Sequence, residues 1–251
     1  MIKIVTGKLG QGKTLYSVME MFDDFCGGNT VCTNIAVDME EIKCLARRSV
    51  GVEVLDSQLI QVTPEDDPNW HKSIPWGVVG KPVKVYLDEI HLFFNARDWS
   101  KTATDSKSLL KFLTQSRKAA VDITFIAQDK ETIEKQFRVL AEWEYYVTSS
   151  DHIPLGPIIG PVARFLGLKC FIVVVKDAGK GTFQKRIWRK YDKRFFRLYG
   201  SFTFLDKEMN ELYAGITKVA PVKLVKVGAM RRAWLNLKVP VRRAFSKVKA
   251  S

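Results

Sequence analysis

The stretch GKLGQGKT, residues Gly7 to Thr14, fits the pattern G-x-x-x-x-G-K-[ST] and decides the fold. An apolar run at residues 1–5 predicts a buried strand before it, and apolar residues at helical spacing predict a helix over residues 13–26. Glycines allow consecutive backbone N–H groups to turn toward one anion, and the positive end of the helix dipole favours the same anion. The sequence therefore predicts a cradle for phosphate groups, in preference to a merely flexible turn.

The residues of this loop have expected roles in binding a nucleoside triphosphate. Lys13 is expected to reach the β- and γ-phosphates, and the Thr14 hydroxyl is expected to ligate Mg²⁺. Lys8 is a second lysine, for which a solvent-facing position is favoured over a contact across a subunit interface. The candidate nucleotide-binding residues are Gly7, Lys8, Leu9, Gly10, Gln11, Gly12, Lys13 and Thr14.

Polar side chains at the ends of two later strands complete the candidate site. The run VYLDE places Asp88 at the end of an apolar strand, where its carboxylate is expected to hold the Mg²⁺ shell directly or through water. Glu89 follows and is the candidate for polarising an attacking water. Gln128 ends a strand that is expected to neighbour the Asp88 strand. We favour a role for Gln128 as a sensor of the γ-phosphate over that of a simple loop-facing glutamine.

Two arginines are candidates for completing the site of a neighbouring subunit. Arg97 follows the Asp88 strand, and Arg117 precedes the Gln128 strand. Either one can act as an arginine finger in an oligomer. For each residue taken singly, the alternative is a solvated arginine near a helix end.

The remaining pattern alternates strands with helices and ends in a hairpin. We expect further strands at residues 30–35, 83–89, 122–128 and 144–150. We expect further helices at residues 38–50, from a cap at Asp105 or Ser106 to residue 120, and after a cap at Asp129. Residues 56–82 are interpreted as loop, and residues 169–189 as a β-hairpin. This order predicts an α/β fold with a doubly wound, mostly parallel sheet and helices on both faces.

Charge and element order predict three parts of the chain. Residues 1–190 are expected to form a P-loop ATPase domain, residues 191–215 a short helical extension, and residues 216–251 a basic amphipathic segment. The net charge of the 251 residues is +13, yet residues 212–251 alone hold ten Lys and Arg and no Asp or Glu. For this tail we favour an anionic lipid surface over nucleic acid, and both over a solvated tail.

Composition disfavours two other classes of protein. The four cysteines contain no C-x-x-C pair, so reduced thiols in a cytosolic compartment are expected rather than a zinc site or a disulfide framework. No stretch reaches the roughly 18 uncharged apolar residues of a membrane-spanning helix, and no signal peptide is expected.

In three blocks the chain resembles the Zot family, the zonula occludens toxin-like proteins that include the gene I assembly protein of filamentous phages. The blocks are IVTGKLGQGKT, YLDEIHLFFNARDWS and SRKAAVDITFIAQD, within residues 1–190. The resemblance implies a cytoplasmic P-loop ATPase domain, related to FtsK/HerA-type motors. The family's nucleotide-site positions match Lys13, Thr14, Asp88 and Glu89, and its other marked positions match Asn95, Arg97, Trp99 and Arg117.

The resemblance implies a motor that uses ATP and Mg²⁺ to drive assembly and extrusion of filamentous phage at the host inner membrane. The implied partners are further copies of the chain, anionic inner-membrane lipid through the basic tail, phage coat or other assembly proteins, and phage single-stranded DNA. The implied location is the host cytoplasm, at the cytoplasmic face of the inner membrane.

Other interpretations stay open at this point. One alternative is a soluble DNA-packaging or DNA-translocating ATPase of the FtsK/HerA type, whose basic tail grips DNA. Another is a non-enzymatic, membrane-bound interaction protein. Family members usually continue into a transmembrane helix and a periplasmic tail, so this chain is expected to be either a cytoplasmic fragment or a peripheral membrane protein.

Overall fold

One eight-stranded sheet organises the described part of the chain. The computed structural model describes residues 1–64, 67, 69–78, 80–89, 103–150 and 170–200. The strands are β1 (Ile2–Thr6), β2 (Val31–Thr33), β3 (Leu59–Gln61), β4 (Val83–Leu87), β5 (Val121–Ile126), β6 (Trp143–Ser149), β7 (Cys170–Asp177) and β8 (Phe183–Lys190). Their order across the sheet is β3-β2-β4-β5-β1-β6-β7-β8.

The sheet is parallel from β3 to β6 and antiparallel beyond it. β1 lies between β5 and β6, and β5 lies between β1 and β4, all in parallel register. β7 and β8 add an antiparallel hairpin next to β6. Because parallel strands end at the same edge of a sheet, the carboxyl ends of β1, β4 and β5 lie together. The predicted mostly parallel α/β sheet and its C-terminal hairpin are confirmed.

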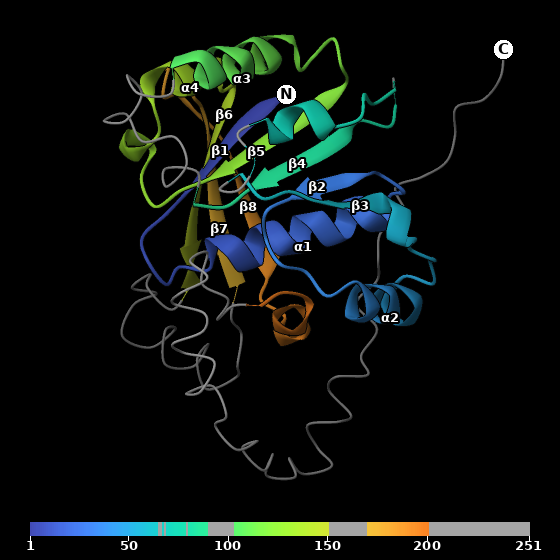
Figure 1. Cartoon of the computed structure of the whole chain (residues 1–251). Coiled ribbons are helices and arrows are strands. Elements are labelled where there is room, and N and C mark those ends of the chain that lie inside the picture. The colour runs from blue at the N-terminus through green and yellow to red at the C-terminus, as the bar shows by residue number, and fades with distance from the viewer. Residues whose placement is uncertain (65–66, 68, 79, 90–102, 151–169, 201–251) are drawn as a thin grey trace, which may run out of the picture. The chain divides into compact units, whose positions relative to one another are not determined.

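Helices cover both faces of this sheet (Figure 1). The α-helices are α1 (Lys13–Cys26), α2 (Met39–Ser49), α3 (Ala103–Gln115) and α4 (Lys135–Leu140), and short 3₁₀ helices are η1 (Asp56–Gln58), η2 (Trp70–Ser73), η4 (Lys130–Thr132) and η6 (Lys193–Leu198). In Figure 1, α1 and α2 lie on one side of the sheet, and α3 and α4 lie on the other. Alternate residues of β1 point to opposite faces of the sheet. Ile2 and Ile4 belong to one core cluster, and Val5 belongs to the other.

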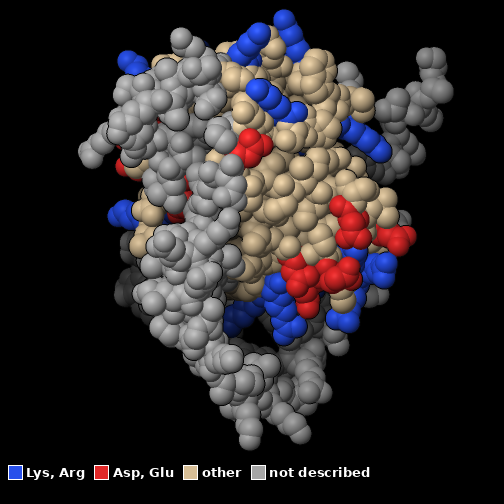
Figure 2. Space-filling view, viewed as in Figure 1, with Lys and Arg blue, Asp and Glu red and all other residues tan. Residues whose placement is uncertain are grey.

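The outer face of α2 carries charges of both signs. Lys43 pairs with Glu40 at 2.8 Å and with Asp56 at 2.7 Å. Arg47 pairs with Glu53 at 3.1 Å. Figure 2 shows acidic and basic residues side by side in the lower right of the view, where α2 lies. Exposed pairs of this kind contribute little to stability because solvent screens them, so the core contributes most of it.

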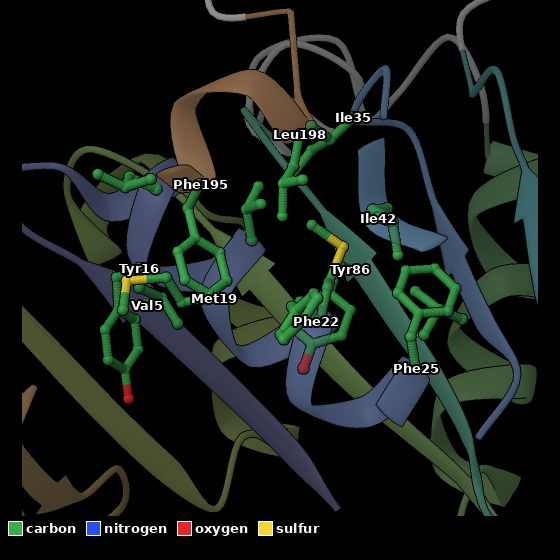
Figure 3. Packing of buried hydrophobic residues seen from close by; sticks show 14 of the residues in the cluster. Val5, Tyr16, Met19, Phe22, Phe25, Ile35, Ile42, Tyr86, Phe195 and Leu198 are labelled. Carbon is green, nitrogen blue, oxygen red and sulfur yellow. The ribbon is translucent and has the colours of Figure 1, made fainter. Parts of the chain in front are cut away.

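The core between α1 and the sheet is almost entirely apolar at its centre (Figure 3). The apolar residues at helical spacing on α1 are buried, and they are Leu15, Val18, Phe22 and Phe25. They pack with Val5 and Tyr86 of the sheet in one cluster. Burying each such side chain contributes about 1.5–3 kcal/mol, so this face anchors the first helix on the strand that precedes it.

The helix η6 belongs to the same core, although it follows the predicted domain boundary at residue 190. The rings of Phe195 and Phe22 meet edge to face with centroids 5.2 Å apart, and Leu198 is 1% exposed. Figure 3 shows the side chains of Phe195 and Leu198 pointing toward α1. The Asp38 N–H also donates to the Leu198 carbonyl at 2.8 Å. The compact body therefore continues past residue 190 and through residue 200.

Some predicted element bounds differ from the structure. The loop expected at residues 56–82 contains the short strand β3, which pairs with β2 and with no other described strand. The helix α3 begins at Ala103, so neither Asp105 nor Ser106 caps it. Asp129 caps only the single turn η4, because its carboxylate accepts from the Glu131 N–H, and α4 begins separately at Lys135. The helical extension beyond residue 200 and the basic tail lie outside the described residues.

We expect Leu198→Ala to lower the free energy of unfolding by about 2–5 kcal/mol, because it leaves a cavity between η6 and α1. Urea unfolding measures this change, with Val139→Ala as the control because the Val139 side chain is 73% exposed. Equal unfolding midpoints for the two variants would show that η6 contributes nothing to the core.

Candidate nucleotide-binding site

The loop between β1 and α1 requires glycine at two positions. Gly7 has a φ of +153°, and a Cβ at this residue would clash with the backbone oxygen of Val147 in β6. Gly12 has a φ of +82°, and a Cβ there would lie 2.6 Å from the ring of Phe171 in β7. These two glycines therefore let the loop lie directly against the ends of the neighbouring strands.

Gln11 ties the middle of the loop to β6. Its side chain is 5% exposed, and its Oε1 accepts a hydrogen bond from the Ser149 N–H at 2.9 Å. Lys8 and Leu9 are exposed at the tip of the loop. The base of the loop is thus fixed to the sheet while its tip faces solvent.

Lys13 begins α1 and is buried at the base of the loop. Its Nζ donates to the Lys8 carbonyl at 3.3 Å. Burial lowers the pKa of Lys13, while the negative charges of Glu89 and Asp88 act to raise it. A cation held in a poorly solvated position beside backbone N–H groups at a helix start is well placed to bind an anion.

A hydrogen bond joins the loop to the acidic pair that follows β4. The Thr14 hydroxyl donates to Asp88 Oδ2 at 2.8 Å, across 74 positions of sequence. Burial raises the pKa of Asp88 to about 6, and the nearby charge of Glu89 acts in the same direction. The hydrogen bond from Thr14 and the charge of Lys13 oppose this rise.

Asn34, just after β2, holds the backbone at the acidic pair and was missed by the sequence analysis. Its Nδ2 donates to the Asp88 carbonyl at 3.0 Å, and its Oδ1 accepts from the Asp88 N–H at 2.8 Å. One carboxamide therefore satisfies both backbone groups of Asp88. The available signal was a polar residue ending a strand, the same signal that identified Asp88, but nothing in the sequence showed that β2 and β4 are neighbours.

Glu89 has a strained backbone. Its φ is +49°, in the left-handed region that non-glycine residues other than Asn and Asp rarely occupy. Its N–H donates to Asp88 Oδ1 at 2.9 Å, which helps to hold this turn. Strain of this kind costs of order 1–3 kcal/mol and persists where the surroundings enforce it, often at functional sites.

Gln128 lies at the same edge of the sheet as the loop. It follows β5, the strand between β1 and β4, and the preceding Ala127 N–H donates to the Val5 carbonyl at 3.0 Å. Gln128 is predicted to follow a neighbour of the Asp88 strand, and β5 is such a neighbour. The side chain of Gln128 is exposed.

Of the two candidate arginines, only Arg117 lies among the described residues, and it is not at this edge. Arg117 precedes β5 and pairs with Glu142, which precedes β6, with Nη2 and Oε2 2.9 Å apart. Because β5 and β6 run parallel to β1, Arg117 lies at the edge opposite its own loop. Arg97 lies outside the described residues, and so do Asn95 and Trp99.

The donor atoms that face one another at the start of α1 suit a magnesium nucleotide. The Thr14 hydroxyl and the Asp88 carboxylate are hard oxygen ligands, which Mg²⁺ prefers. The loop supplies backbone N–H groups and one buried ammonium for phosphate oxygens. The residues present therefore fit both groups.

This combination of a parallel α/β sheet, a glycine loop at the start of the first helix and an acid from a strand two places away defines a P-loop NTPase. Comparison with protein families then gives a more particular assignment. The chain belongs to the family described as Zonular occludens toxin (Zot), whose model matches residues 1–203. The resemblance found in the sequence is confirmed.

Curated relatives of the chain are phage proteins. The Gene 1 protein of Escherichia phage If1 is 30% identical over 168 residues, which make up 64% of this chain and 45% of that protein. The Gene 1 protein of Salmonella phage IKe is 30% identical over 170 residues, which make up 66% of this chain and 44% of that protein. The chain thus spans less than half the length of these relatives.

Two solved structures can be superimposed on the chain with modest scores. The N-terminal domain of zonular occludens toxin from Neisseria meningitidis is 19% identical, with a TM-score of 0.44 over 79% of this chain and 98% of that one. The genome packaging NTPase from Sulfolobus turreted icosahedral virus 2 is 11% identical, with a TM-score of 0.42 over 76% of this chain and 97% of that one.

Within the described ranges, no helix combines the length and the apolar character that a bilayer-spanning helix requires.

We expect Asn34→Ala to lower the free energy of unfolding by about 1–3 kcal/mol, because it leaves two backbone groups of Asp88 without their partner. Thermal unfolding measures the change. Asn69→Ala is the matched control, since the Asn69 side chain makes no hydrogen bond to the described residues. A loss no larger than that of the control would contradict the role assigned to Asn34.

The raised pKa of Asp88 predicts a pH-dependent effect of Asp88→Asn. An acid whose pKa is higher in the folded state than in the unfolded state destabilises the protein as pH rises between the two values. The pKa of Asp88 rises from 3.8 to about 6 on folding. The natural chain therefore loses free energy of unfolding between about pH 4 and pH 6, whereas the Asp88→Asn variant does not lose it. The variant should gain about 2 kcal/mol of relative stability across this window, because part of the total effect develops outside it. Urea unfolding at pH 4.5 and pH 7 checks it, and a pH-independent difference would contradict it.

Proposed function

We propose that this chain binds and hydrolyses ATP with Mg²⁺, as the motor part of a machine that assembles and extrudes filamentous phage. The observation that carries the proposal is the hydrogen bond between Thr14 and Asp88, because it joins a phosphate loop to an acid from a different strand. Membership of the Zot family and similarity to phage Gene 1 proteins support the role in phage assembly.

The loop residues bind the triphosphate. Backbone N–H groups of residues 7–14 and the start of α1 face the phosphates, and Lys13 exchanges its hydrogen bond with the Lys8 carbonyl for phosphate oxygens. Thr14 and Asp88 hold Mg²⁺. The ion, when bound, neutralises charge on the terminal phosphates.

Glu89 acts on the attacking water. Its backbone conformation is fixed by its hydrogen bond to Asp88, and Asn34 fixes Asp88 in turn. The carboxylate accepts a proton from water as the γ-phosphate is attacked, and so works as a general base. Gln128, at the end of the intervening strand, contacts the γ-phosphate or orients the water.

A second copy of the chain completes the site. Arg117 lies at the edge opposite its own loop, so it reaches a loop only in a head-to-tail oligomer. Arg97 is the other candidate for this role. An arginine supplied in this way stabilises the charge that develops on the transferred phosphoryl group.

The proposed location is the cytoplasmic face of the host inner membrane. Ten Lys and Arg without an acidic residue in residues 212–251 favour attachment to anionic lipid, since each basic residue near such a surface contributes about 1 kcal/mol. Phage coat or other assembly proteins are the proposed protein partners.

We expect Lys13→Ala to abolish ATP turnover and Glu89→Gln to lower kcat by about 10²–10⁴-fold while ATP still binds, because the amide cannot accept the proton. Phosphate release at saturating ATP measures kcat, and a fluorescent ATP analogue measures binding.

Two matched substitutions control for nonspecific effects on the surface. Lys72→Ala and Glu41→Gln change exposed residues of the same types elsewhere and should leave turnover unchanged. Turnover by Lys13→Ala equal to that of the natural chain would exclude this site as the ATPase.

A further inference from the structure

The edge strand β8 exposes two large aromatic rings. Phe183 and Trp188 are each 59% exposed. β8 is the last strand in the sheet order, and its outer edge pairs with no other described strand. Large aromatic side chains are normally buried, so two of them exposed on one short strand indicate a contact surface.

A β-bulge brings both rings to the same face of the sheet. Trp188 lies opposite Ile172, but Phe183 lies opposite Lys176, with a register shift between Val175 and Lys176. Residues opposite one another share a face, and Ile172 and Lys176 are an even number of positions apart on β7. Phe183 and Trp188 therefore share a face, although their own odd separation along β8 predicts opposite faces.

Cations separate and flank the rings on this face. Arg186 lies opposite Val174 and Lys190 lies opposite Cys170, which places both on the face of Trp188. Neither cation makes an ion pair with a described residue. The face defined by Phe183, Arg186, Trp188 and Lys190 is named the hairpin platform below.

The surroundings of the platform add positive charge. Beyond the platform itself, the hairpin holds Lys180 and Lys185, and Asp177 and Asp192 flank residues 178–191. Lys176 of β7 is on the same face. Glu144 of β6 also shares this face, opposite Lys176, and it pairs with Lys130 at 3.5 Å. The platform therefore presents a net positive surface to solvent.

The opposite face of the same two strands is packed against α1. Arg189 of β8 donates to the Met19 carbonyl at 2.8 Å and pairs with Asp23 at 2.7 Å. On β7, Phe171 is 1% exposed and lies against Gly12 of the phosphate loop. The platform is thus held on a rigid base that reaches the nucleotide site.

We infer that the hairpin platform binds single-stranded nucleic acid, with bases stacking on Phe183 and Trp188 and phosphates contacting Arg186 and Lys190. Alternating aromatic rings and cations are the means by which proteins bind single strands without sequence preference. Lysines and arginines on an edge strand can also prevent edge-to-edge association of sheets. That role explains the charges on β8 but does not explain the exposure of Phe183 and Trp188.

This inference rests on the proposed motor function in one respect, namely that the bound strand is the polymer the motor moves. Binding itself needs no ATP and is measured without it. Failure of the ATPase, for example in Lys13→Ala, therefore leaves strand binding intact and is distinguishable from failure of the platform.

The test compares two fluorescent strands of equal length, an oligothymidylate of about 20 nucleotides and an abasic strand, bound to the full chain. The basic tail attracts both strands through their phosphates, whereas stacking requires bases. We expect the natural chain to bind oligothymidylate at least about tenfold more tightly, from stacking on two rings. The double variant F183A/W188A should bring this ratio close to one.

One further test variant and two matched controls accompany the test. Trp76→Ala removes a tryptophan that is 80% exposed elsewhere and should keep the tenfold ratio. The double variant R186E/K190E should weaken binding of both strands and flatten its dependence on salt, since fewer counterions are released. The double variant K72E/K111E makes the same charge change at exposed sites away from β8 and should affect binding less.

Two results would overturn the inference. One is a ratio near one for the natural chain, or a ratio that F183A/W188A leaves unchanged. The other is that F183A/W188A weakens binding to phosphatidylglycerol vesicles and not to oligothymidylate, which would make the platform a lipid contact. Circular dichroism melting of each variant confirms that the fold is retained.

Discussion

The hydrogen bond from Thr14 to Asp88 is the contact on which the candidate site depends. It joins the start of α1 to the residue that follows β4, and β5 lies between β4 and β1, so it requires α1, β4 and β5 to be in their final places. Gly7, Gly12 and Gln11 also position the loop, because they let it pack against β6 and β7. The site is therefore a product of the strand order as well as of the loop that first drew attention to it.

Most of the architecture could be predicted from local patterns. The helix α1 has the bounds expected from its apolar spacing, and β7 and β8 form the hairpin expected from the turn between them. The strand β3 was missed because three residues among prolines and polar residues carry too little pattern, and its pairing with β2 is a tertiary contact. The cap expected at Asp105 failed for a related reason, since several polar residues near it satisfy the same local rule.

Candidate site residues could be predicted where the residue type itself indicates a chemical role. They could not be predicted where the role depends only on which strands are neighbours. Lysine, threonine and aspartate at characteristic positions pointed to phosphate and metal. Asn34 has no such signature, because its importance comes from β2 lying beside β4. The hairpin platform was hidden for a similar reason, since one extra residue in β8 moves Phe183 to the other face and no sequence rule locates that bulge.

The conformation of Glu89 has an evolutionary consequence. Its left-handed backbone suits glycine, asparagine or aspartate better than glutamate. Selection for thermostability alone would therefore replace the side chain, whereas the role proposed for its carboxylate in turnover would retain it. Under that proposal, a lineage that no longer needs hydrolysis is free to drift to glycine at this turn.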